Sequence, residues 1–431
     1  MTRTIHRRNA LKSTVALGTG LFLWTRSAPG VESPDEKLNV ACIGVGGQGA
    51  ANVHGLASHN LVAFADVDDQ RAAKTFEQFP EVKRYRDYRR MLDDLHGQLH
   101  AVAISTPDHM HFHPTYMAMQ YGLHVYLEKP LAHNVWEIRT LTELARKKKL
   151  ATQLGVQRHV GANMHRIVEL VKSGAIGDVR EVHSWMNGSR GMPEVPSDQP
   201  PVPAHLDWDL WIGPAKLRPY HPSICPYGWR FWWNYGTGET GNFGCHILDI
   251  PFWALDLTYP TRVEGSGPPV DPERSPKSMH VKYEFPANGA RPPVTLHWYH
   301  AANGPDILRQ HNLPEKGHNT LMIGSQGMLL CGFGSRTLLP KEKFAGFKAP
   351  EPSIPESPGF HREFIAACKG GPPATCCFDY SGPLAETVIV GNVAYRAGRF
   401  DWDAKALKPV GNKAAEPLIR ETYRAGWTVN A

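Results

Sequence analysis

Several features that mark large protein classes are missing from this sequence. The seven cysteines form no repeated CxxC pair, and an odd number cannot close a complete set of disulfides within one chain. No internal repeat is present, and no apolar run after the N-terminal region is long enough to span a bilayer. We therefore expect buried free thiols and a soluble mature chain with no stable membrane insertion.

The chain also lacks a large excess of charge of either sign. The 47 Lys+Arg and 41 Asp+Glu residues give a formal net charge of +6, which is modest for 431 residues. The densest basic run, residues 146–149, is typical of a helix C-terminus, where cations complement the helix dipole. We therefore predict no nucleic-acid partner. The 42% of hydrophobic residues indicates a well-packed globular protein, and the length predicts two domains.

The N-terminus carries the pattern of an export signal. Arg7 and Arg8 precede Leu11, and a mild apolar run follows over residues 15–24. Paired arginines before a short apolar segment are typical of the twin-arginine route. We interpret residues 1–36 as a twin-arginine signal peptide and linker, which predicts a periplasmic or other extracytoplasmic protein. No clean cleavage motif is present, and a chance basic N-terminus is the alternative.

A glycine motif follows the first strand pattern. Residues 38–43 are apolar, and the next residues fit G-x-G-x-x-G before a helical stretch. In this motif the glycines allow a tight turn, a close approach of backbone to a pyrophosphate, and close packing of helix on strand. The helix N-terminus then offers unpaired N–H groups to the anion. We assign to cofactor binding Gly44, Gly46, Gly47, Gln48 and Gly49.

An acidic residue indicates which dinucleotide is bound. Residues 61–65 predict a second strand, which ends at Asp66. A carboxylate at this place suits the free ribose hydroxyls of NAD and repels the additional phosphate of NADP. We therefore expect NAD, with NADP kept open as the alternative by the nearby Arg71.

The third strand pattern, residues 101–105, ends in Thr106 and Pro107, which we add to the cofactor-binding set. Three alternate histidines follow, at His109, His111 and His113. They would share one face only on a strand, whereas this stretch opens a helix that scatters them. No carboxylate or cysteine lies at ligand spacing either. We therefore predict no metal site and place His111 near the cofactor.

A lysine ends the fourth strand pattern, residues 122–127. Glu128, Lys129 and Pro130 follow at the point where a parallel sheet opens into its ligand crevice. Beside a cationic nicotinamide the pKa of Lys129 should fall, which suits proton transfer or the orientation of a hydroxyl. A solvated lysine at a strand end is the alternative. Glu128 joins the cofactor-binding set.

A second candidate cluster lies at residues 241–249, which read GNFGCHILD. His246 has Asn242 four positions before it and Asp249 three positions after it. Local spacing alone leaves a catalytic cluster, a metal site and a turn before a buried helix as alternatives. As a catalytic group His246 suits a base, because imidazole titrates near neutral pH. Asp249 would then orient the ring, or only cap the local structure.

Together these motifs resemble the Gfo/Idh/MocA oxidoreductase family. The resemblance covers nearly everything after residue 37, and its specific part is the Glu-Lys-Pro element with the downstream histidine. The residues that carry it are the glycine motif, Asp66, Thr106-Pro107, Glu128-Lys129-Pro130, and the segments 155–158, 173–177, 208–214 and 386–394.

The resemblance implies a fold and a set of roles. An α/β chain is expected, with a Rossmann domain of doubly wound parallel sheet at residues 37–156. A C-terminal α/β domain with a large, open, mostly antiparallel sheet is expected at residues 157–431, for substrate binding and oligomerisation. One face of that sheet commonly forms an interface in the family, which implies a homodimer or homotetramer. Lys129 and His246 match the family pair that acts on a sugar or polyol hydroxyl.

Asn242 departs from the family pattern, because the family usually has aspartate at its position. An asparagine cannot accept a proton, but it can donate and accept hydrogen bonds. We therefore expect Asn242 to position groups in the catalytic site, and we expect His246 to do the base chemistry.

The region after residue 157 has its own pattern. Residues 228–235 form the densest aromatic stretch, and we expect most of its rings in the core and one or two in contact with a ligand. Proline-rich residues 341–357 predict a surface excursion. The pattern predicts strands at 281–283, 294–299, 320–323 and 328–330 and helices at 361–368 and 384–397.

Three functions are consistent with these residues. The leading one is an exported NAD(P)-dependent oxidoreductase acting on a small carbohydrate, with His246 as base and Lys129 stabilising alkoxide charge. A redox-neutral alternative is glycoside cleavage through transient oxidation, with a tightly bound and recycled nucleotide. A non-catalytic sugar-binding protein is the third. Neither the sugar nor the oxidised carbon follows from the sequence.

Overall fold

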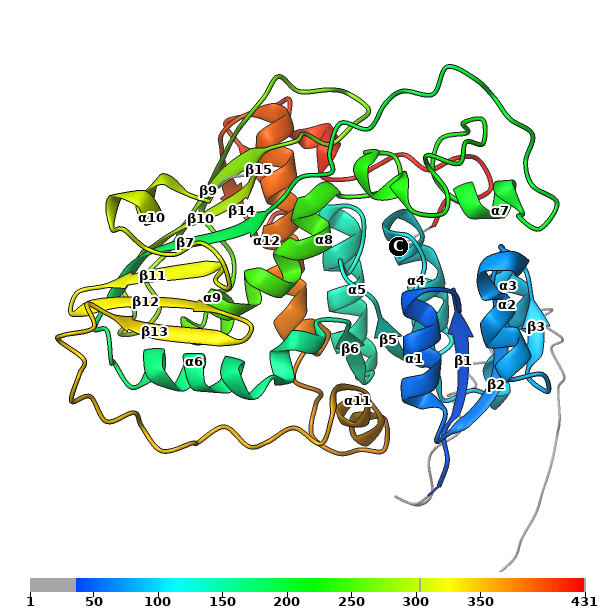
Figure 1. The fold of residues 1–431 in the computed structure, drawn as a ribbon. Helices are drawn as coiled ribbons and strands as arrows, with labels where there is room; N and C mark the ends of the chain where they lie inside the picture. The colour runs from blue at the N-terminus through cyan, green and yellow to red at the C-terminus, as the bar shows by residue number, and fades with distance from the viewer. Residues whose placement is uncertain (1–35, 302–303, 430–431) are drawn as a thin grey trace, which may run out of the picture.

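The computed structural model describes residues 36–301 and 304–429 and contains two β-sheets with helices packed against them (Figure 1). The expected twin-arginine pair and apolar run lie outside the described residues. No helix in these ranges combines the length and the apolar character that a membrane crossing requires. All seven cysteines are described and none forms a disulfide, and six of them are buried, as expected.

The N-terminal sheet has six parallel strands in the order β3-β2-β1-β4-β5-β6. The order reverses between β1 and β4, which places a ligand crevice at their carboxyl ends. The strands are β1 (Asn39–Ile43), β2 (Asn60–Ala65), β3 (Lys83–Tyr85), β4 (Ala101–Ile104), β5 (His124–Leu127) and β6 (Thr152–Leu154). The helical segments are α1 (Gln48–Leu56), α2 (Asp69–Gln78), α3 (Tyr88–Leu95), η1 (His96–Gln98), η2 (Asp108–Met110), α4 (Phe112–Gln120) and α5 (Val135–Lys148).

The four strands predicted for this region are confirmed, because buried apolar runs mark β1, β2, β4 and β5. The edge strands β3 and β6 have no predicted counterpart. Each has three residues, and none of the three in β3 is buried. Strands this short and polar lack the apolar periodicity on which prediction depends.

The second sheet has nine strands in the order β13-β12-β11-β7-β10-β9-β8-β14-β15. Neighbours are antiparallel except β7 and β10, which are parallel. The strands are β7 (Val179–Asn187), β8 (Arg262–Ser266), β9 (Met279–Phe285), β10 (Val294–Ala301), β11 (Thr320–Gly324), β12 (Gly327–Gly332), β13 (Ser335–Leu339), β14 (Phe400–Asp403) and β15 (Lys408–Val410). The expected fold class, a parallel Rossmann sheet followed by a mostly antiparallel one, is confirmed.

Helices of the second region pack on this sheet and between the two sheets (Figure 1). They are η3 (Gln157–Val160), α6 (Ala162–Lys172), α7 (Trp208–Ile212), η4 (Gly228–Phe231), α8 (Gly238–Ile247), α9 (Asp249–Ala254), α10 (Asp306–Gln310), α11 (Phe360–Cys368), α12 (Phe378–Ala397) and η5 (Glu416–Leu418). The predicted strands fall within β9 to β12 and the predicted helices within α11 and α12. Residues 341–357 form a mostly exposed loop, as expected for a surface excursion.

Helix α12 joins the two regions of the chain. Its Glu386 is buried and accepts hydrogen bonds from the guanidinium of Arg139 on α5, with Nη2 2.8 Å from Oε2. Further along α12, the side chain of Asn392 donates to the backbone oxygen of Thr237 at 2.8 Å. Thr237 is the N-cap of α8. Helix α12 therefore fixes the start of α8 relative to α5.

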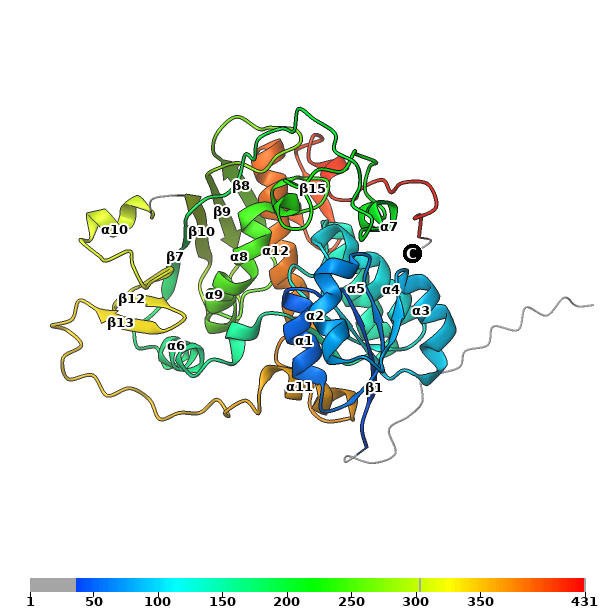
Figure 2. The same cartoon turned by 45° about the vertical axis from the view of Figure 1, so that its right-hand side comes forward.

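Residues 203–231, here called the crossing segment, run over the N-terminal region. In both views the part that contains α7 lies over the first sheet and its helices (Figures 1 and 2). Leu206 forms an antiparallel bridge with Asp68, just after β2. The N–H of Asp207 donates to the backbone oxygen of Val67 at 2.9 Å. A small buried cluster holds the segment together: Leu206, Trp211, Ile212, Ile224, Cys225, Trp229, Trp232 and Tyr235.

Gly391 marks the close approach of α12 to the second sheet. A Cβ added at Gly391 would lie 2.1 Å from the hydroxyl oxygen of Tyr283 on β9. We expect Gly391→Ala to lower the free energy of unfolding by about 1–3 kcal/mol, because a packed interior must shift to admit a methyl group. Denaturant unfolding measures this change. Gly97→Ala is the control, since a Cβ there meets nothing within 4 Å, and an equal effect of the two substitutions would contradict the packing argument.

Candidate functional site

A cavity of about 430 Å³ opens at the carboxyl edge of the first sheet. The second region closes it from the other side through the crossing segment and α8. The predicted site residues that line the cavity are Gly44, Gly46, Gln48, Asp66, Thr106, Pro107, Glu128, Lys129, Asn242 and His246. Those outside its lining are Gly47, Gly49, His111 and Asp249.

The glycine loop forms one end of the cavity. Gly44 follows β1 with a φ of 75°, and a Cβ on Gly49 would lie 1.9 Å from the backbone oxygen of Gly44. Gly47 is the N-cap of α1, and no side chain caps this helix. The N–H groups of Gly49 and Ala50 donate to the backbone oxygens of Gly46 and Gly47, so among the described residues the N–H groups of Gly47 and Gln48 remain for an anion. Gly47 and Gly49 shape the loop from behind, and the loop fits the pyrophosphate of a dinucleotide.

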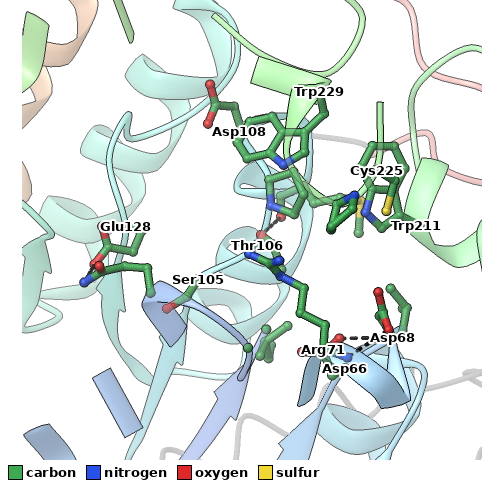
Figure 3. Close-up of a pocket in the computed structure, with 18 of the residues that line it drawn as sticks. Asp66, Asp68, Arg71, Ser105, Thr106, Asp108, Glu128, Trp211, Cys225 and Trp229 are labelled. Carbon is green, nitrogen blue, oxygen red and sulfur yellow. Dashed lines mark hydrogen bonds between the residues drawn. The ribbon is translucent and has the colours of Figure 1, made fainter. Parts of the chain in front are cut away.

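Asp66 lies beside the loop and can accept further hydrogen bonds. Its Oδ2 accepts from the N–H of Val45 at 2.8 Å, and its Oδ1 accepts from the N–H of Asp68 at 3.0 Å. Each oxygen keeps lone-pair capacity for a ribose hydroxyl. Burial raises the pKa of Asp66, and the two backbone donors oppose this shift. Figure 3 shows Trp211 and Trp229 of the crossing segment across the cavity from Asp66.

The three alternate histidines are scattered, as expected for a helix start. Nε2 of His109 lies 2.9 Å from the backbone oxygen of Trp211, and Nε2 of His113 lies 2.9 Å from that of Trp427. Burial lowers the pKa of each of these two rings to about 4. They therefore hold the crossing segment and the C-terminal residues against the first sheet as neutral hydrogen-bond donors.

His111 does not line the cavity, contrary to its expected place in the cofactor-binding set. Its Nε2 lies 2.9 Å from the backbone oxygen of Thr106, and its Nδ1 lies 2.5 Å from that of Pro130. The ring is almost fully buried between these two oxygens. His111 therefore ties the loop after β4 to the loop after β5 and influences the cavity only through their positions.

Lys129 reaches into the cavity from the end of β5, and its peptide bond to Pro130 is cis. Its ammonium donates to the backbone oxygen of Asn242 at 2.7 Å and to the Oδ1 of the same residue at 3.0 Å. Burial lowers the pKa of Lys129, and the nearby carboxylates of Asp108 and Glu128 oppose this shift. Lys129 is therefore an enclosed donor bonded across the cavity, and the alternative of a freely solvated lysine is wrong.

Asn242 connects a cation with a carboxylate. While its Oδ1 accepts from Lys129, its Nδ2 donates to Oε2 of Glu239 at 3.3 Å. Glu239 is fully buried and also pairs with Arg190, whose Nη2 lies 2.7 Å from Oε2. A neutral amide serves both neighbours at once. An aspartate at this position would instead face Glu239 with a second negative charge.

His246 lies one turn beyond Asn242 on α8 and lines the cavity near Lys129. Burial lowers the pKa of His246 to about 3, and the charges of Lys129 and Arg158 act in the same direction. The imidazole is therefore neutral near pH 7 and can accept a hydrogen bond, but it does not titrate near neutral pH as expected and is a weaker base than an exposed histidine. A cationic donor and a neutral acceptor thus share one end of the cavity.

Asp249 does not orient His246, which corrects that expectation. Helix α8 ends at Ile247 and α9 begins at Asp249, so the two residues do not share one helical face. The carboxylate of Asp249 lies 3.0 Å from Nδ1 of His159 and accepts from the hydroxyl of Tyr380 at 2.5 Å. The buried Nδ1 of His246 has no hydrogen-bond partner among the described residues. Asp249 is therefore part of a separate buried network.

Comparison with known families agrees with this geometry. A family model described as an oxidoreductase family with an NAD-binding Rossmann fold matches residues 38–156. The model of the corresponding C-terminal alpha/beta domain matches residues 161–429, which is more than half of the chain. The chain belongs to the Gfo/Idh/MocA oxidoreductase family.

Two carbohydrate dehydrogenases are among the curated proteins that are similar to this chain. Levoglucosan dehydrogenase from Pseudarthrobacter phenanthrenivorans is 26% identical over 230 residues, which cover 50% of this chain and 50% of that protein. Inositol 2-dehydrogenase from Arthrobacter sp. is 28% identical over 155 residues, covering 34% of this chain and 45% of that protein. The matches thus span half of these relatives' length or less.

Solved structures of the same fold cover almost the whole described chain. An oxidoreductase from Thermotoga maritima superimposes with a TM-score of 0.59 at 16% identity, covering 86% of this chain and 100% of that one. An inositol dehydrogenase homologue from Azotobacter vinelandii, solved with NAD+, gives a TM-score of 0.58 at 17% identity, with 85% and 98% covered. At this identity the likeness establishes the fold that this family member shares with them.

Several site residues have no predicted counterpart in the family pattern. Arg230 lines the cavity with its guanidinium over Trp229, 4.2 Å from the ring centroid. The dense aromatic stretch was the available signal for both. Within that stretch Trp229 lines the cavity, whereas Trp232 is buried elsewhere. Arg190 and Glu239 carry no local signal, because they become neighbours only when the segment after β7 packs against α8.

Because three buried histidines are neutral in the folded chain, its stability decreases at acidic pH. Burial lowers the pKa of His109, His113 and His300 to about 4, below the ordinary value of 6.5. The unfolded chain therefore binds protons first, so this contribution to stability is complete above pH 6.5 and is lost as the pH falls toward 4. At pH 5 each of these rings lowers the free energy of unfolding by roughly 2 kcal/mol relative to neutral pH.

We expect the free energy of unfolding, measured by denaturant titration, to fall between pH 7.5 and pH 5. In the His113→Gln variant the decrease should be smaller, because an amide can still donate to Trp427 and does not titrate. Equal slopes for the variant and the wild-type chain over this range would refute this contribution.

The Asn242–Glu239 contact can be tested with a double-mutant cycle. We expect Asn242→Asp to lower the free energy of unfolding more in a chain that has Glu239 than in the Glu239→Gln variant. Two carboxylates this close repel, and coupling energies for such contacts are about 1–3 kcal/mol. Denaturant unfolding of the four proteins at pH 8 gives the coupling energy, and a value of zero would show that Glu239 does not sense the charge at position 242.

Proposed function

We propose that this chain is an NAD-dependent oxidoreductase that acts on a hydroxyl-bearing carbon of a sugar or polyol. The supporting observation is that two half-sites share one cavity. The glycine loop with Asp66 forms one half, and the donor Lys129 with the neutral acceptor His246 forms the other. Oxidation of an alcohol needs both, since a hydride leaves the carbon and a proton leaves the oxygen. The dehydrogenases for levoglucosan and inositol among the relatives favour a carbohydrate.

The N-terminal half of the cavity would hold the nucleotide. The backbone around Gly44 and Gly46 would take the pyrophosphate, and Asp66 would take the ribose hydroxyls. A bound nicotinamide supplies a hydride acceptor. Asp66 favours NAD, because its half-buried carboxylate would meet the 2′-phosphate of NADP. Arg71 lies close enough that a Cβ on Gly47 would be 2.7 Å from its guanidinium, and this cation keeps NADP as the alternative.

The other half of the cavity would manage the substrate hydroxyl. His246 would take the hydroxyl proton, since its imidazole is neutral, and its low pKa leaves more of the barrier to the charge stabilisation by Lys129. Lys129 donates to the same oxygen and stabilises the negative charge that develops as the proton leaves. Asn242 holds the Lys129 ammonium in place with two acceptor oxygens. The enclosure of Lys129 strengthens its electrostatic effect, because little water competes.

A second candidate function is redox-neutral glycoside cleavage with a resident nucleotide. The crossing segment favours it. Backbone hydrogen bonds tie residues 205–207 to residues 67–69 directly beside Asp66. Trp211 and Trp229 cover the nucleotide end of the cavity (Figure 3). A nucleotide enclosed in this way would exchange slowly and be reused in each turnover, which suits a compartment with little free NAD.

The cellular setting is proposed from the sequence and the family. Arg7 and Arg8 support export by the twin-arginine route, which carries folded proteins and suits a chain that must close around its nucleotide first. The family resemblance supports assembly into a homodimer or homotetramer.

Substitution of the two proposed catalytic residues tests the function. We expect His246→Ala and Lys129→Ala each to lower kcat/KM by about 10²–10⁴-fold, because each removes proton transfer or charge stabilisation. The exposed residues His54 and Lys147 provide matched controls as His54→Ala and Lys147→Ala. A carbohydrate screen followed for NADH and for keto-sugar measures turnover, and mass spectrometry identifies the nucleotide that co-purifies.

Wild-type turnover in both variants would reject the assigned roles. Loss of the bound nucleotide in proportion to activity would also reject them, since the residues would then act in cofactor binding. Release of an aglycone without net NADH would select the redox-neutral candidate over net oxidation.

A further inference from the structure

A cluster of histidines lies on the second sheet, outside the cavity described above. His183 on β7 is the direct cross-strand partner of His297 on β10. His280 on β9 is the partner of Tyr299 on β10. Glu181 precedes His183 by two residues and therefore points to the same face of β7. Three adjacent strands thus bring together residues that are far apart in the sequence.

The cluster occupies the face of the sheet that points away from α8. Trp298 and Leu296, which alternate with His297 along β10, are fully buried on the opposite face. The indole N–H of Trp298 donates to the hydroxyl of Thr240 on α8 at 3.2 Å. Because side chains alternate along a strand, His297 and its neighbours face outward. His297 is partly buried, and the side chain of Glu181 is 46% exposed.

The spacing of the side chains suits a shared ligand. The rings of His183 and His297 are stacked, with centroids 4.8 Å apart and planes 8° from parallel. Nε2 of His183 lies 2.8 Å from Oε1 of Glu181. One ligand atom from each of Glu181, His183 and His297 lies within 4.8 Å of the others. Donors on a tetrahedral zinc ion are roughly 3.3 Å apart, so the two stacked rings must rotate, together with the exposed glutamate, to aim their lone pairs at one ion.

The remaining ring nitrogens already have supporting partners. Nδ1 of His297 lies 2.9 Å from Nε2 of His280, and Nδ1 of His183 lies 3.1 Å from the hydroxyl of Tyr299. Metal-binding histidines usually have this second hydrogen bond, which fixes the ring and its tautomer. A tyrosine hydroxyl both donates and accepts, so it permits the tautomer of His183 that frees Nε2. Nε2 of His297 is thus left for a ligand, and Nε2 of His183 becomes available when its contact with Glu181 is exchanged for a metal.

One cation lies next to the cluster. Lys282 on β9 is the direct cross-strand partner of His297. It is paired with Glu284, 2.9 Å away, which offsets its charge.

We propose that Glu181, His183 and His297 form a binding site for a late first-row divalent cation, with zinc as the best match. Two imidazoles and one carboxylate are typical zinc donors, and they leave a fourth position for water or for a further ligand. His280 and Tyr299 position the two imidazoles. The site is separate from the proposed oxidoreductase cavity, since none of its residues lines that cavity.

Metal titration of the full-length, tag-free protein tests the site. After dialysis against a chelator, we expect isothermal titration with ZnCl2 to give one tight site per chain. Cobalt(II) should give the visible absorption of a four-coordinate complex. His297→Gln should weaken zinc binding by about tenfold or more, and Tyr299→Phe should weaken it by a smaller factor, because loss of a supporting hydrogen bond typically costs about 10–100-fold.

Two further variants make the test decisive. Glu181→Gln removes a ligand charge from a half-exposed side chain, so it reports on the site even if His297→Gln unfolds the chain. His221→Gln is the matched control, since His221 and Asp198 form another histidine–carboxylate pair, 3.1 Å apart. No binding tighter than about 1 mM, or equal affinity in wild type and Glu181→Gln, would overturn the proposal. Reduced affinity in Glu181→Gln together with an unchanged His221→Gln would support it.

Discussion

The buried ion pair between Glu386 and Arg139 is the contact on which the site depends. It fixes α12 against α5, and α12 in turn holds the start of α8 through Asn392. Helix α8 carries Asn242 and His246, whereas Lys129 follows β5 of the other sheet. Removing one partner of a buried ion pair leaves an uncompensated charge that costs about 3–5 kcal/mol. The two halves of the cavity are therefore joined outside the cavity by this ion pair as well as across it by Lys129 and Asn242.

Burial also determines the electrostatics of the cavity. Loss of water lowers the pKa of Lys129 and keeps His246 neutral, so a donor and an acceptor coexist side by side. Asn242 fits this environment because its amide satisfies Lys129 on one side and Glu239 on the other without adding charge. A carboxylate at position 242 would add a charge that these surroundings do not balance. In this chain a buried carboxylate lies one turn earlier on α8, where Arg190 balances it.

The histidines illustrate how one residue type takes different roles according to its surroundings. His109, His111 and His113 lie close together in the sequence, yet each contacts a backbone oxygen of a different segment. They fasten the crossing segment, two cavity loops and the C-terminal residues. His183 and His297 lie far apart in the sequence, yet they stack on neighbouring strands and form the proposed metal site. The spacing of these histidines along the chain predicted no metal site, neither at residues 109–113 nor at His183 and His297.

The sequence by itself determined the features that depend on local backbone requirements. The glycine loop, Asp66 at the end of β2, Lys129 at the end of β5 and the main buried strands follow from apolar runs and turns within one strand–loop–helix unit. Only the tertiary structure decided which side chains meet. The break between α8 and α9 turns Asp249 toward His159, and the packing of the segment after β7 on α8 brings Arg190 to Glu239. Contacts of this kind join residues from distant segments, and their geometry is fixed by packing that no local pattern encodes.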